Sequence, residues 1–263
     1  DWMPTCLRLK THLEIESCLI QFGKILIDSI NDRACAIKLQ AAYFEQYGLQ
    51  GLSALAYLTG YARSKSIQII MDAKRGDIGT SSLGYAKAYL QPSIDVVDGV
   101  KLENSFYSDA LTIAPYMGHD SLMPFVDEAI KSNGGVFVLL HTSNPGAKDI
   151  QHLESEGVLL YTRVAEFIFN TSSHLSKGDA GFCDVGVVVG ATVKEDVEKL
   201  RAMLPHHFFL MPGLGAQGGS LDTIFAAMDE NGLGVLVPVS RGISKPSDFS
   251  MSLDAYRSDL DTK

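Results

Sequence analysis

Short apolar runs rich in β-branched residues alternate with longer amphipathic segments along the whole chain. Seven runs are apolar at consecutive positions, which is typical of parallel strands that are buried on both faces. These runs lie at residues 34–39, 67–74, 109–115, 134–143, 185–192, 208–213 and 233–241. Segments with helical periodicity separate them, at 8–30, 46–65, 81–91, 119–132, 157–175, 193–203 and 219–230, with a last one after Lys245.

The regular alternation of strand and helix predicts an α/β protein with a parallel sheet and outer helices. We expect a single domain over residues 1–263, because no linker or low-complexity segment interrupts the pattern. A TIM (β/α)8 barrel fits best, since its typical length is about 250 residues, and its first strand is then expected at or before Asp1. The alternative is an open doubly wound sheet, which would usually carry a G-x-G-x-x-G motif after its first strand, and no strand here carries one in that context.

Composition and charge narrow the class of protein. Of the 263 residues, 46% are hydrophobic and 20% are charged, and the formal net charge is -9. No apolar run approaches the roughly 18 residues of a membrane span, and the opening Asp-Trp-Met-Pro is unlike a secretory leader. The acidic balance argues against a nucleic-acid partner. The cysteines are scattered and lack metal-ligand spacing, which favours a reduced, cytoplasmic protein without a bound metal. They are Cys6, Cys18, Cys35 and Cys183.

Charged side chains interrupt two neighbouring apolar runs at the carboxyl end. Lys38 lies near the end of one run, and the next run ends in Asp72 and Lys74, with Asp77 following. Because residues i and i+2 of a strand share a face, Asp72 and Lys74 are expected to point together into the mouth of the barrel. Buried charges need opposite partners, so the alternating Lys38, Asp72, Lys74 and Asp77 predict a catalytic array. A purely structural ion-pair network is the alternative interpretation.

Two later segments have the composition of anion-binding loops. Pro212 to Gly219 (PGLGAQGG) follows one apolar run and precedes a helix, and Ser240, Arg241 and Gly242 follow the last run. Loops after the seventh and eighth strands of such barrels commonly hold a phosphate. Backbone amides and an arginine can donate to phosphate oxygens, so the two loops together favour a phosphorylated substrate. The glycine-dense loop is also expected to close over the ligand, with Gln217 at its tip.

The segment Asp72 to Ile78 (DAKRGDI) resembles the D-x-K-x-x-D-I signature of orotidine 5′-phosphate decarboxylase, in the longer subgroup of that family. Further stretches resemble the same family in the same order: 38–48 (KLQAAYFEQYG), 112–118 (TIAPYMG), 136–145 (VFVLLHTSNP), 187–192 (VVVGAT), 212–219 and 240–243 (SRGI). Their combined span argues against a chance similarity. The resemblance implies decarboxylation of orotidine 5′-phosphate to UMP in de novo pyrimidine biosynthesis, without a metal or organic cofactor.

The resemblance also implies roles for particular residues. Lys74 would protonate C6 of the pyrimidine, and Asp72 would lie beside the substrate carboxylate. Lys38 and Asp77 would complete the charged array and hold the ribose. The remaining substrate contacts would come from Asp1, Ser81, Thr112, Ser143, Pro212, Gln217, Ser240, Arg241 and Gly242.

Four of these contacts have a specific part of the substrate assigned to them by the resemblance. Asp1 would bind the ribose, and Ser143 would contact the edge of the pyrimidine. Arg241 would bind the phosphate, while Gln217 would close over both base and phosphate.

The family is usually a homodimer, and the resemblance therefore implies a second copy of this chain as a partner. In the family, the second aspartate of the motif and a threonine shortly after it reach the neighbouring site. These positions are Asp77 and Ser81 here, so the second position keeps the hydroxyl and loses a methyl group.

Two other functions stay open at this point. A magnesium-dependent sugar-phosphate decarboxylase of the same superfamily also carries D-x-K-x-x-D, but it places a carboxylate where Lys38 stands. A catalytically silent phosphate-binding barrel would have no reason to keep the whole acid-base array. The chain is either a free enzyme or one half of a fusion with orotate phosphoribosyltransferase. The segment 92–108 is interpreted as an insertion before the fourth strand.

Overall fold

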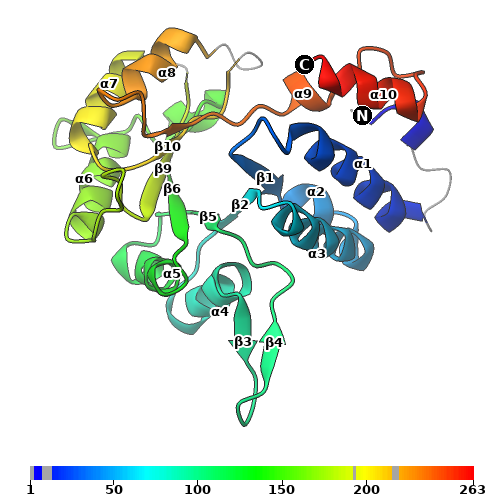
Figure 1. The fold of residues 1–263 in the computed structure, drawn as a ribbon. Helices are drawn as coiled ribbons and strands as arrows, with labels where there is room; N and C mark the ends of the chain where they lie inside the picture. Colours follow the sequence, from blue (N-terminus) through cyan, green and yellow to red (C-terminus); the bar gives the residue numbers. More distant parts are fainter. Residues whose placement is uncertain (1–2, 8–13, 192–193, 215–218) are drawn as a thin grey trace. The chain divides into compact units, whose positions relative to one another are not determined.

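The computed structural model describes residues 3–7, 14–191, 194–214 and 219–263, and Figure 1 traces them from end to end. The described residues form two compact units. Unit 1 contains the residues up to Ala73 together with 91–109 and 239–263, and unit 2 contains 74–90 and 110–238. The boundary between Ala73 and Lys74 falls inside a strand, so the two halves of the charged motif belong to different units.

The seven predicted strands are all present in the described residues and belong to one sheet. In their hydrogen-bonded order they are β1 (Ala36–Gln40), β2 (Gln68–Arg75), β5 (Ala110–Ile113), β6 (Gly135–His141), β9 (Val185–Val189), β10 (Phe209–Leu210) and β11 (Val235–Leu236). The pairings of β1 with β2, of β5 with β6, and from β6 through β9 and β10 to β11 are parallel. The prediction from consecutive apolar positions is confirmed, most clearly in β9, whose five residues (VGVVV) are all buried.

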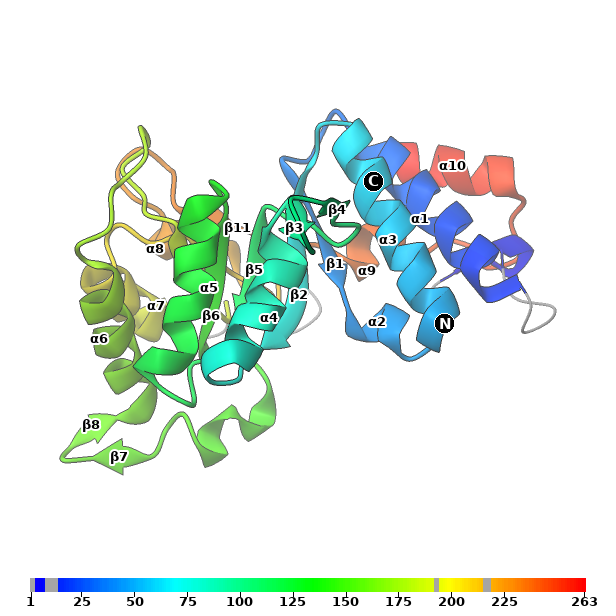
Figure 2. The ribbon, with the colours of Figure 1, turned by 90° about the horizontal axis from the view of Figure 1, so that it is seen from below.

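Helices separate the strands as the amphipathic segments predicted. They are α1 (Ile15–Ile30), α3 (Gly48–Ser64), α4 (Gly79–Leu90), α5 (His119–Lys131), α6 (Leu160–Ser172), α7 (Lys194–Met203), α8 (Leu221–Ala227) and α10 (Leu253–Asp261). Within unit 2, α4 packs on β5, and both α5 and α6 pack on β6 (Figure 2). Among the described residues, we find no helix with the length and apolar character that a membrane crossing needs.

An apolar cluster joins the two ends of the chain within unit 1. It links the short helix η1 (Thr5–Leu7) to α1 and α10, and its buried members are Leu7, Ile25, Tyr256 and Leu260. The helices α1 and α3 also pack closely at Gly23, where a Cβ atom would lie only 2.5 Å from Cδ1 of Leu58. A larger residue at position 23 would therefore force Leu58 to move.

The core of unit 2 contains close strand packing, and a half-buried arginine lies at its edge. At Gly186 of β9, a Cβ atom would lie 2.6 Å from the ring of Phe137 on β6, so glycine makes room for that ring. Arg201 of α7 places its guanidinium 3.8 Å from the centre of the Phe209 ring. Its nitrogens donate to the carbonyl oxygens of Ala227, Leu204, His207 and Gly234. Burial lowers the pKa of Arg201 to about 10.

Some short elements were not predicted from the sequence. They are the helices α2 (Ala42–Glu45), η3 (Pro145–Asp149) and α9 (Arg241–Ser244) and the hairpins β3 (Ser93–Asp95) with β4 (Lys101–Glu103) and β7 (Glu154–Ser155) with β8 (Val158–Leu159). The β3–β4 hairpin occupies the segment interpreted as an insertion, and its turn residues Asp98 and Gly99 both have positive φ, at 51° and 80°. Two consecutive positive φ angles are typical of a tight hairpin turn.

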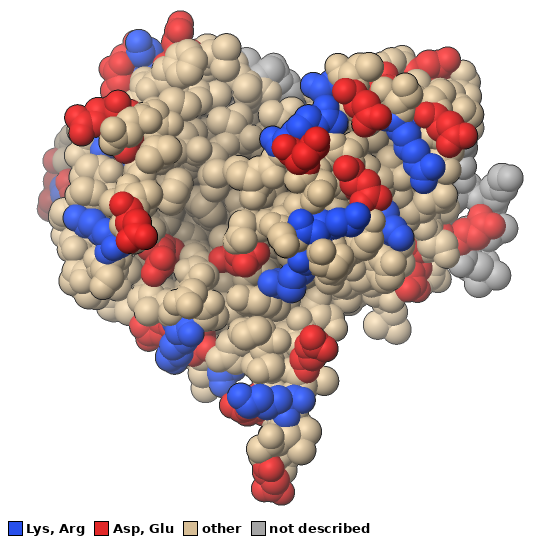
Figure 3. All heavy atoms as spheres, in the orientation of Figure 1, with Lys and Arg blue, Asp and Glu red and all other residues tan. Residues whose placement is uncertain are grey.

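The molecular surface mixes charges of both signs. On the face shown in Figure 3, lysine and arginine side chains are interspersed with aspartate and glutamate. This distribution accompanies the formal net charge of -9 of the whole chain.

Candidate active site

A buried ion pair lies at the carboxyl end of β1 and β2 in unit 1. The Nζ atom of Lys38 is 2.5 Å from Oδ2 of Asp72, and Nε2 of Gln40 donates to the same oxygen at 3.1 Å. Only 8% of the Asp72 side chain and 22% of the Lys38 side chain are exposed. A buried carboxylate requires such partners, because its desolvation otherwise costs several kcal/mol. The sequence predicted that Lys38 and Asp72 meet, but it did not single out Gln40.

The backbone at Lys74 differs from the extended strand that the sequence predicted. Lys74 has a φ of 49°, in the left-handed region that non-glycine residues rarely adopt. The expectation that strand alternation carries through Asp72 and Lys74 is therefore wrong at Lys74, because a left-handed residue interrupts the pleat on which alternation depends. Such strained backbone tends to be found at functional sites, where the surrounding structure holds it.

Two hydrogen bonds hold this strained segment within unit 2. The backbone N–H of Lys74 donates to Oγ1 of Thr112 at 2.9 Å, and the N–H of Ala114 donates to the carbonyl oxygen of Arg75 at 2.8 Å. Thr112 is buried on β5, so its hydroxyl is a fixed acceptor. The guanidinium of Arg75 lies over the rings of two tyrosines of α4, at 5.4 Å from Tyr85 and 5.6 Å from Tyr89. The hydrogen bonds to Thr112 and Ala114 thus tie the backbone of Lys74 and Arg75 to the end of β5.

Asp77 and Ser81 lie where the motif enters α4. The carboxylate of Asp77 accepts a hydrogen bond from the N–H of Ile78 at 2.8 Å, and its carbonyl oxygen accepts one from the hydroxyl of Ser82. An acidic side chain at this place is favourable, because the N-terminus of a helix carries a partial positive charge. Asp77 is half-buried and Ser81 is exposed.

Ser143 follows β6 and packs against the end of β9. A Cβ atom at Gly190 would lie 2.8 Å from the Cβ of Ser143, so only glycine leaves room for the serine at this distance. The N–H of Gly190 also donates to the carbonyl oxygen of His141 at 2.7 Å, which ties the two strand ends together. Gly190 was not among the predicted site residues, although a glycine directly after a buried strand is a recognisable signal of close backbone approach.

Ionisable side chains surround the buried His141, which ends β6. Its Nε2 atom is 3.4 Å from Nε2 of His152 and 3.7 Å from Oδ2 of Asp196. Burial lowers the pKa of His141 and outweighs the opposing effect of Asp196. Tyr161 donates to Oδ1 of Asp196 at 2.8 Å, and burial together with this carboxylate raises the pKa of Tyr161 to about 12. The neutral forms of both rings are therefore favoured next to the turn that carries Ser143.

The first predicted anion loop is described at its two ends. Gly213 has a φ of 111°, and its carbonyl oxygen accepts the N–H of Gly219 at 3.1 Å, which closes the loop at its base. The carbonyl oxygen of Pro212 accepts the N–H of Ala191 at 3.3 Å. A Cβ atom at Gly219 would lie 3.0 Å from Ala191, so this glycine too permits close approach. Gln217 lies outside the described residues, as does Asp1 at the start of the chain.

The second predicted anion loop forms the start of α9 in unit 1. Ser240 precedes this helix, and its carbonyl oxygen accepts the N–H of Ser244 at 2.8 Å. The hydroxyl of Tyr256 donates to the carbonyl oxygen of Ser244 at 2.7 Å, which attaches the segment to the apolar cluster of unit 1. Arg241 and Gly242 are exposed at the first turn of α9.

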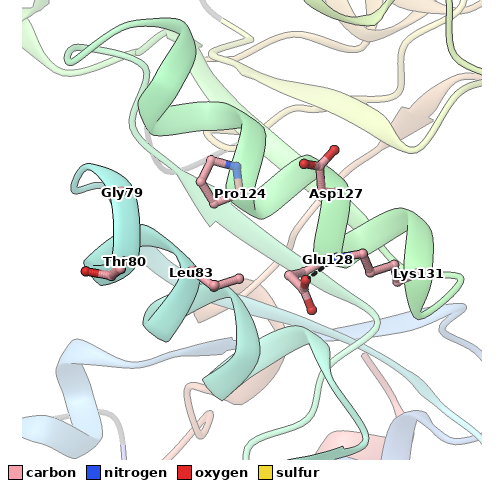
Figure 4. A pocket seen from close by; sticks show the side chains of 7 residues that line it. All are labelled: Gly79, Thr80, Leu83, Pro124, Asp127, Glu128 and Lys131. Atoms are coloured by element: carbon pink, nitrogen blue, oxygen red, sulfur yellow. Dashed lines mark hydrogen bonds and ion pairs between the residues drawn. The ribbon is translucent and has the colours of Figure 1, made fainter.

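A pocket of about 440 Å³ lies between α4 and α5 in unit 2 (Figure 4). Its lining residues are Gly79, Thr80, Leu83, Pro124, Asp127, Glu128 and Lys131. Lys131 and the buried Glu128 form an ion pair of 2.7 Å at its edge. None of the predicted site residues lines this pocket, so it is distinct from the residues at the strand ends.

In the described residues, parallel strands alternate with helices, and charged and hydroxyl side chains lie toward the carboxyl ends of the strands, an arrangement typical of (β/α)8-barrel enzymes. Residues 24–256 match the model of the orotidine 5′-phosphate decarboxylase / HUMPS family. The chain belongs to this family.

Individual relatives are similar over most of the chain. The orotidine 5′-phosphate decarboxylase of Caldicellulosiruptor saccharolyticus is 38% identical over 237 residues, which cover 90% of this chain and 76% of the relative. The structure of Leishmania donovani OMP decarboxylase is 32% identical with a TM-score of 0.73, covering 95% of this chain and 87% of that chain. Leishmania donovani UMP synthase is 34% identical with a TM-score of 0.74, and this chain covers only 50% of its length.

Proposed function

We propose that this chain decarboxylates orotidine 5′-phosphate to UMP, as the names of its relatives indicate for them. The observation that carries the proposal is the arrangement of charged residues on β2. The buried carboxylate of Asp72 is paired with Lys38, and Lys74 follows two residues later with its backbone in a strained conformation. This arrangement concentrates charge of both signs at one strand end, as decarboxylation of a charged substrate requires.

The chemistry follows from where charge develops. When the C6–carboxylate bond breaks, CO2 departs and the electron pair of that bond stays on C6. The ammonium of Lys74 stabilises this charge electrostatically and then donates its proton to C6, which gives UMP. Asp72 lies beside the substrate carboxylate and opposes it in the ground state, and this repulsion is relieved as CO2 leaves. Lys38 compensates the buried charge of Asp72, and together with Asp77 and Asp1 it binds the ribose.

The remaining residues bind the parts of the substrate that do not react. Ser143 contacts the pyrimidine edge. Thr112 contacts the substrate, and its hydroxyl also accepts the backbone N–H of Lys74. Arg241, flanked by Ser240 and Gly242, binds the phosphate together with the loop from Pro212 to Gln217. Binding energy from the phosphate can contribute to the chemical step as well as to affinity, because it orders the groups around the ring.

We further propose that a second copy of this chain completes the site near Asp77 and Ser81. The support is an exposed apolar surface next to Asp77 in unit 2: 55% of Ile78, 89% of Tyr116 and 44% of Met117 are exposed. Gly76 also adjoins this surface, since a Cβ atom at position 76 would lie 3.6 Å from Cε of Met117.

The free thiols of Cys18, Cys35 and Cys183 support a reducing, cytoplasmic setting for the protein.

The test of the proposed function is the loss of orotidine 5′-phosphate followed by ultraviolet absorbance, with EDTA and with added Mg²⁺ in parallel. We expect equal rates in the two conditions and UMP as the product. No conversion in either condition would refute the proposed function. Conversion of a sugar phosphate that depends on Mg²⁺, without conversion of the nucleotide, would instead support the sugar-phosphate decarboxylases of the superfamily.

A further inference from the structure

We propose that Gln151 is a positioning residue for Ser143 and acts through the turn formed by residues 142–144. The inference rests on the proposed function, in which Ser143 contacts the edge of the pyrimidine. Gln151 was not singled out in the sequence, and it lies beyond the motif that carries the family resemblance around Ser143.

The side chain of Gln151 makes two hydrogen bonds to a single residue, Thr142. Its Oε1 atom accepts the backbone N–H of Thr142 at 2.9 Å, and its Nε2 atom donates to Oγ1 of Thr142 at 2.7 Å. The hydroxyl of Thr142 in turn donates to Oδ1 of Asn144 at 2.7 Å. Each donor in this series has its own acceptor, so the hydrogen bonds fix one orientation of both amides. The series spans Ser143 and fixes the residues on both sides of it.

Gln151 is itself held firmly enough to serve as a support. Its backbone N–H donates to the carbonyl oxygen of Ala147 at 2.7 Å, and its carbonyl oxygen accepts the N–H of Tyr161 at 3.0 Å. Tyr161 is 2% exposed. On the other side of the turn, Gly190 lies against Ser143 as described above. Ser143 therefore packs against the end of β9 on one side, while the residues that flank it in sequence are held by the hydrogen bonds of Gln151 and Thr142.

The chemistry of the turn requires glutamine rather than its nearest replacements. Glutamate can accept the N–H of Thr142 but has no hydrogen to donate to the threonine hydroxyl. Asparagine is one methylene shorter and cannot reach both atoms from the same backbone position. A displacement of a substrate-contacting group by about 1 Å can reduce a rate by about a hundredfold. Loss of this support should therefore reduce catalysis while the protein stays folded.

The first arm of the test is a double-mutant cycle. The value of kcat/KM for orotidine 5′-phosphate is measured for the wild type, Gln151→Ala, Ser143→Ala and the double variant, with melting temperatures to follow folding. We expect Gln151→Ala to lower kcat/KM about tenfold or more in the wild-type background and less than about twofold in the Ser143→Ala background. Gln151→Glu should fall between the wild type and Gln151→Ala. Gln46→Ala is the matched control, because Gln46 is an exposed glutamine that donates to the carbonyl oxygen of Tyr43 at 3.0 Å. That variant should leave kcat/KM unchanged.

The second arm needs no substrate. Amide hydrogen exchange of the ligand-free protein reports whether the N–H of Thr142 keeps its acceptor, and we expect faster exchange at Thr142 in Gln151→Ala than in the wild type. Equal fold losses in the two backgrounds, or unchanged exchange at Thr142, would overturn the positioning role. If exchange at Thr142 is faster in Gln151→Ala but the wild type does not convert orotidine 5′-phosphate, the proposed function and the catalytic role of the turn are refuted. The structural support of the turn by Gln151 would still stand in that case.

Discussion

The buried His207 predicts a specific loss of stability in acid. His207 is 2% exposed, and its Nε2 atom lies 2.7 Å from Oγ of Ser172. Because the Ser172 hydroxyl donates to the carbonyl oxygen of Ile168, the imidazole N–H must donate to Ser172. The other ring nitrogen, Nδ1, is buried without a hydrogen-bond partner among the described residues. Burial, reinforced by the positive charge of Arg201, lowers the pKa of His207 from 6.5 to about 4.

The sign and size of the effect follow from proton linkage. A histidine with a lowered pKa binds its proton more readily in the unfolded chain, so its contribution to stability is present above pH 6.5 and is lost as pH falls toward 4. Between about pH 7.5 and pH 5, the two pKa values correspond to a loss of about 2 kcal/mol in the free energy of unfolding. For a chain of this size, that is a decrease of about 4–8 °C in Tm.

Thermal unfolding at the two pH values measures this loss. The variant His207→Gln keeps an N–H donor for Ser172 but cannot titrate, so its Tm should fall about 4–8 °C less than that of the wild type over the same range. His206→Gln is the matched control, because His206 is the exposed neighbour of His207. It should follow the wild type. Parallel Tm curves for the wild type and His207→Gln would refute the assignment of a strongly lowered pKa.

The site and its surroundings give three further predictions. Lys38→Met should lower the free energy of unfolding by about 2–3 kcal/mol, somewhat less than for a fully buried pair because Lys38 is 22% exposed. In urea unfolding, the double variant Lys38→Met with Asp72→Leu should regain most of that stability, although it should stay inactive. A double variant that is less stable than Lys38→Met would contradict the account. Thr112→Val removes the acceptor for the Lys74 N–H and should lower kcat about tenfold, in line with about 1–2 kcal/mol for a lost buried hydrogen bond. Thr112→Ser keeps the hydroxyl and should retain activity in the same absorbance assay. Equal kcat values for the two variants would show that the hydroxyl has no role in the reaction. Tyr116→Lys should shift the sedimentation of the chain from dimer to monomer while Tyr116→Phe does not, and an unchanged dimer in Tyr116→Lys would exclude this surface from the interface.

The positions of the strands could be predicted from the sequence because strands buried on both faces leave consecutive apolar residues. The same logic brought Lys38 and Asp72 together, since both lie on neighbouring parallel strands, β1 and β2. It was less accurate for β10 and β11, each of two residues, because the apolar runs at 208–213 and 233–241 also include the loops that follow these strands.

Other features of the site depend on tertiary contacts that the hydrophobic pattern of the sequence does not predict. The left-handed backbone of Lys74 is accompanied by a hydrogen bond from its N–H to the hydroxyl of Thr112, which lies 38 positions away in sequence. Gln151 contacts Thr142 only because η3 turns the chain back, and no periodicity marks that contact. Gln40 could have been found, because it lies two residues after Lys38 and strand alternation places both on the same face. The hydrogen-bonding capacity of such neighbours is the signal to look for.

The most direct test of the central claim compares the wild type with Lys74→Ala under identical conditions in EDTA. The loss of orotidine 5′-phosphate is followed by absorbance, and binding of UMP is measured by calorimetry for both proteins. The account predicts rapid conversion by the wild type, and a loss in Lys74→Ala of at least about 10²–10⁴-fold, the usual contribution of a general acid, with UMP still bound. Conversion by Lys74→Ala at a near-normal rate would contradict the role of Lys74 as the proton donor to C6.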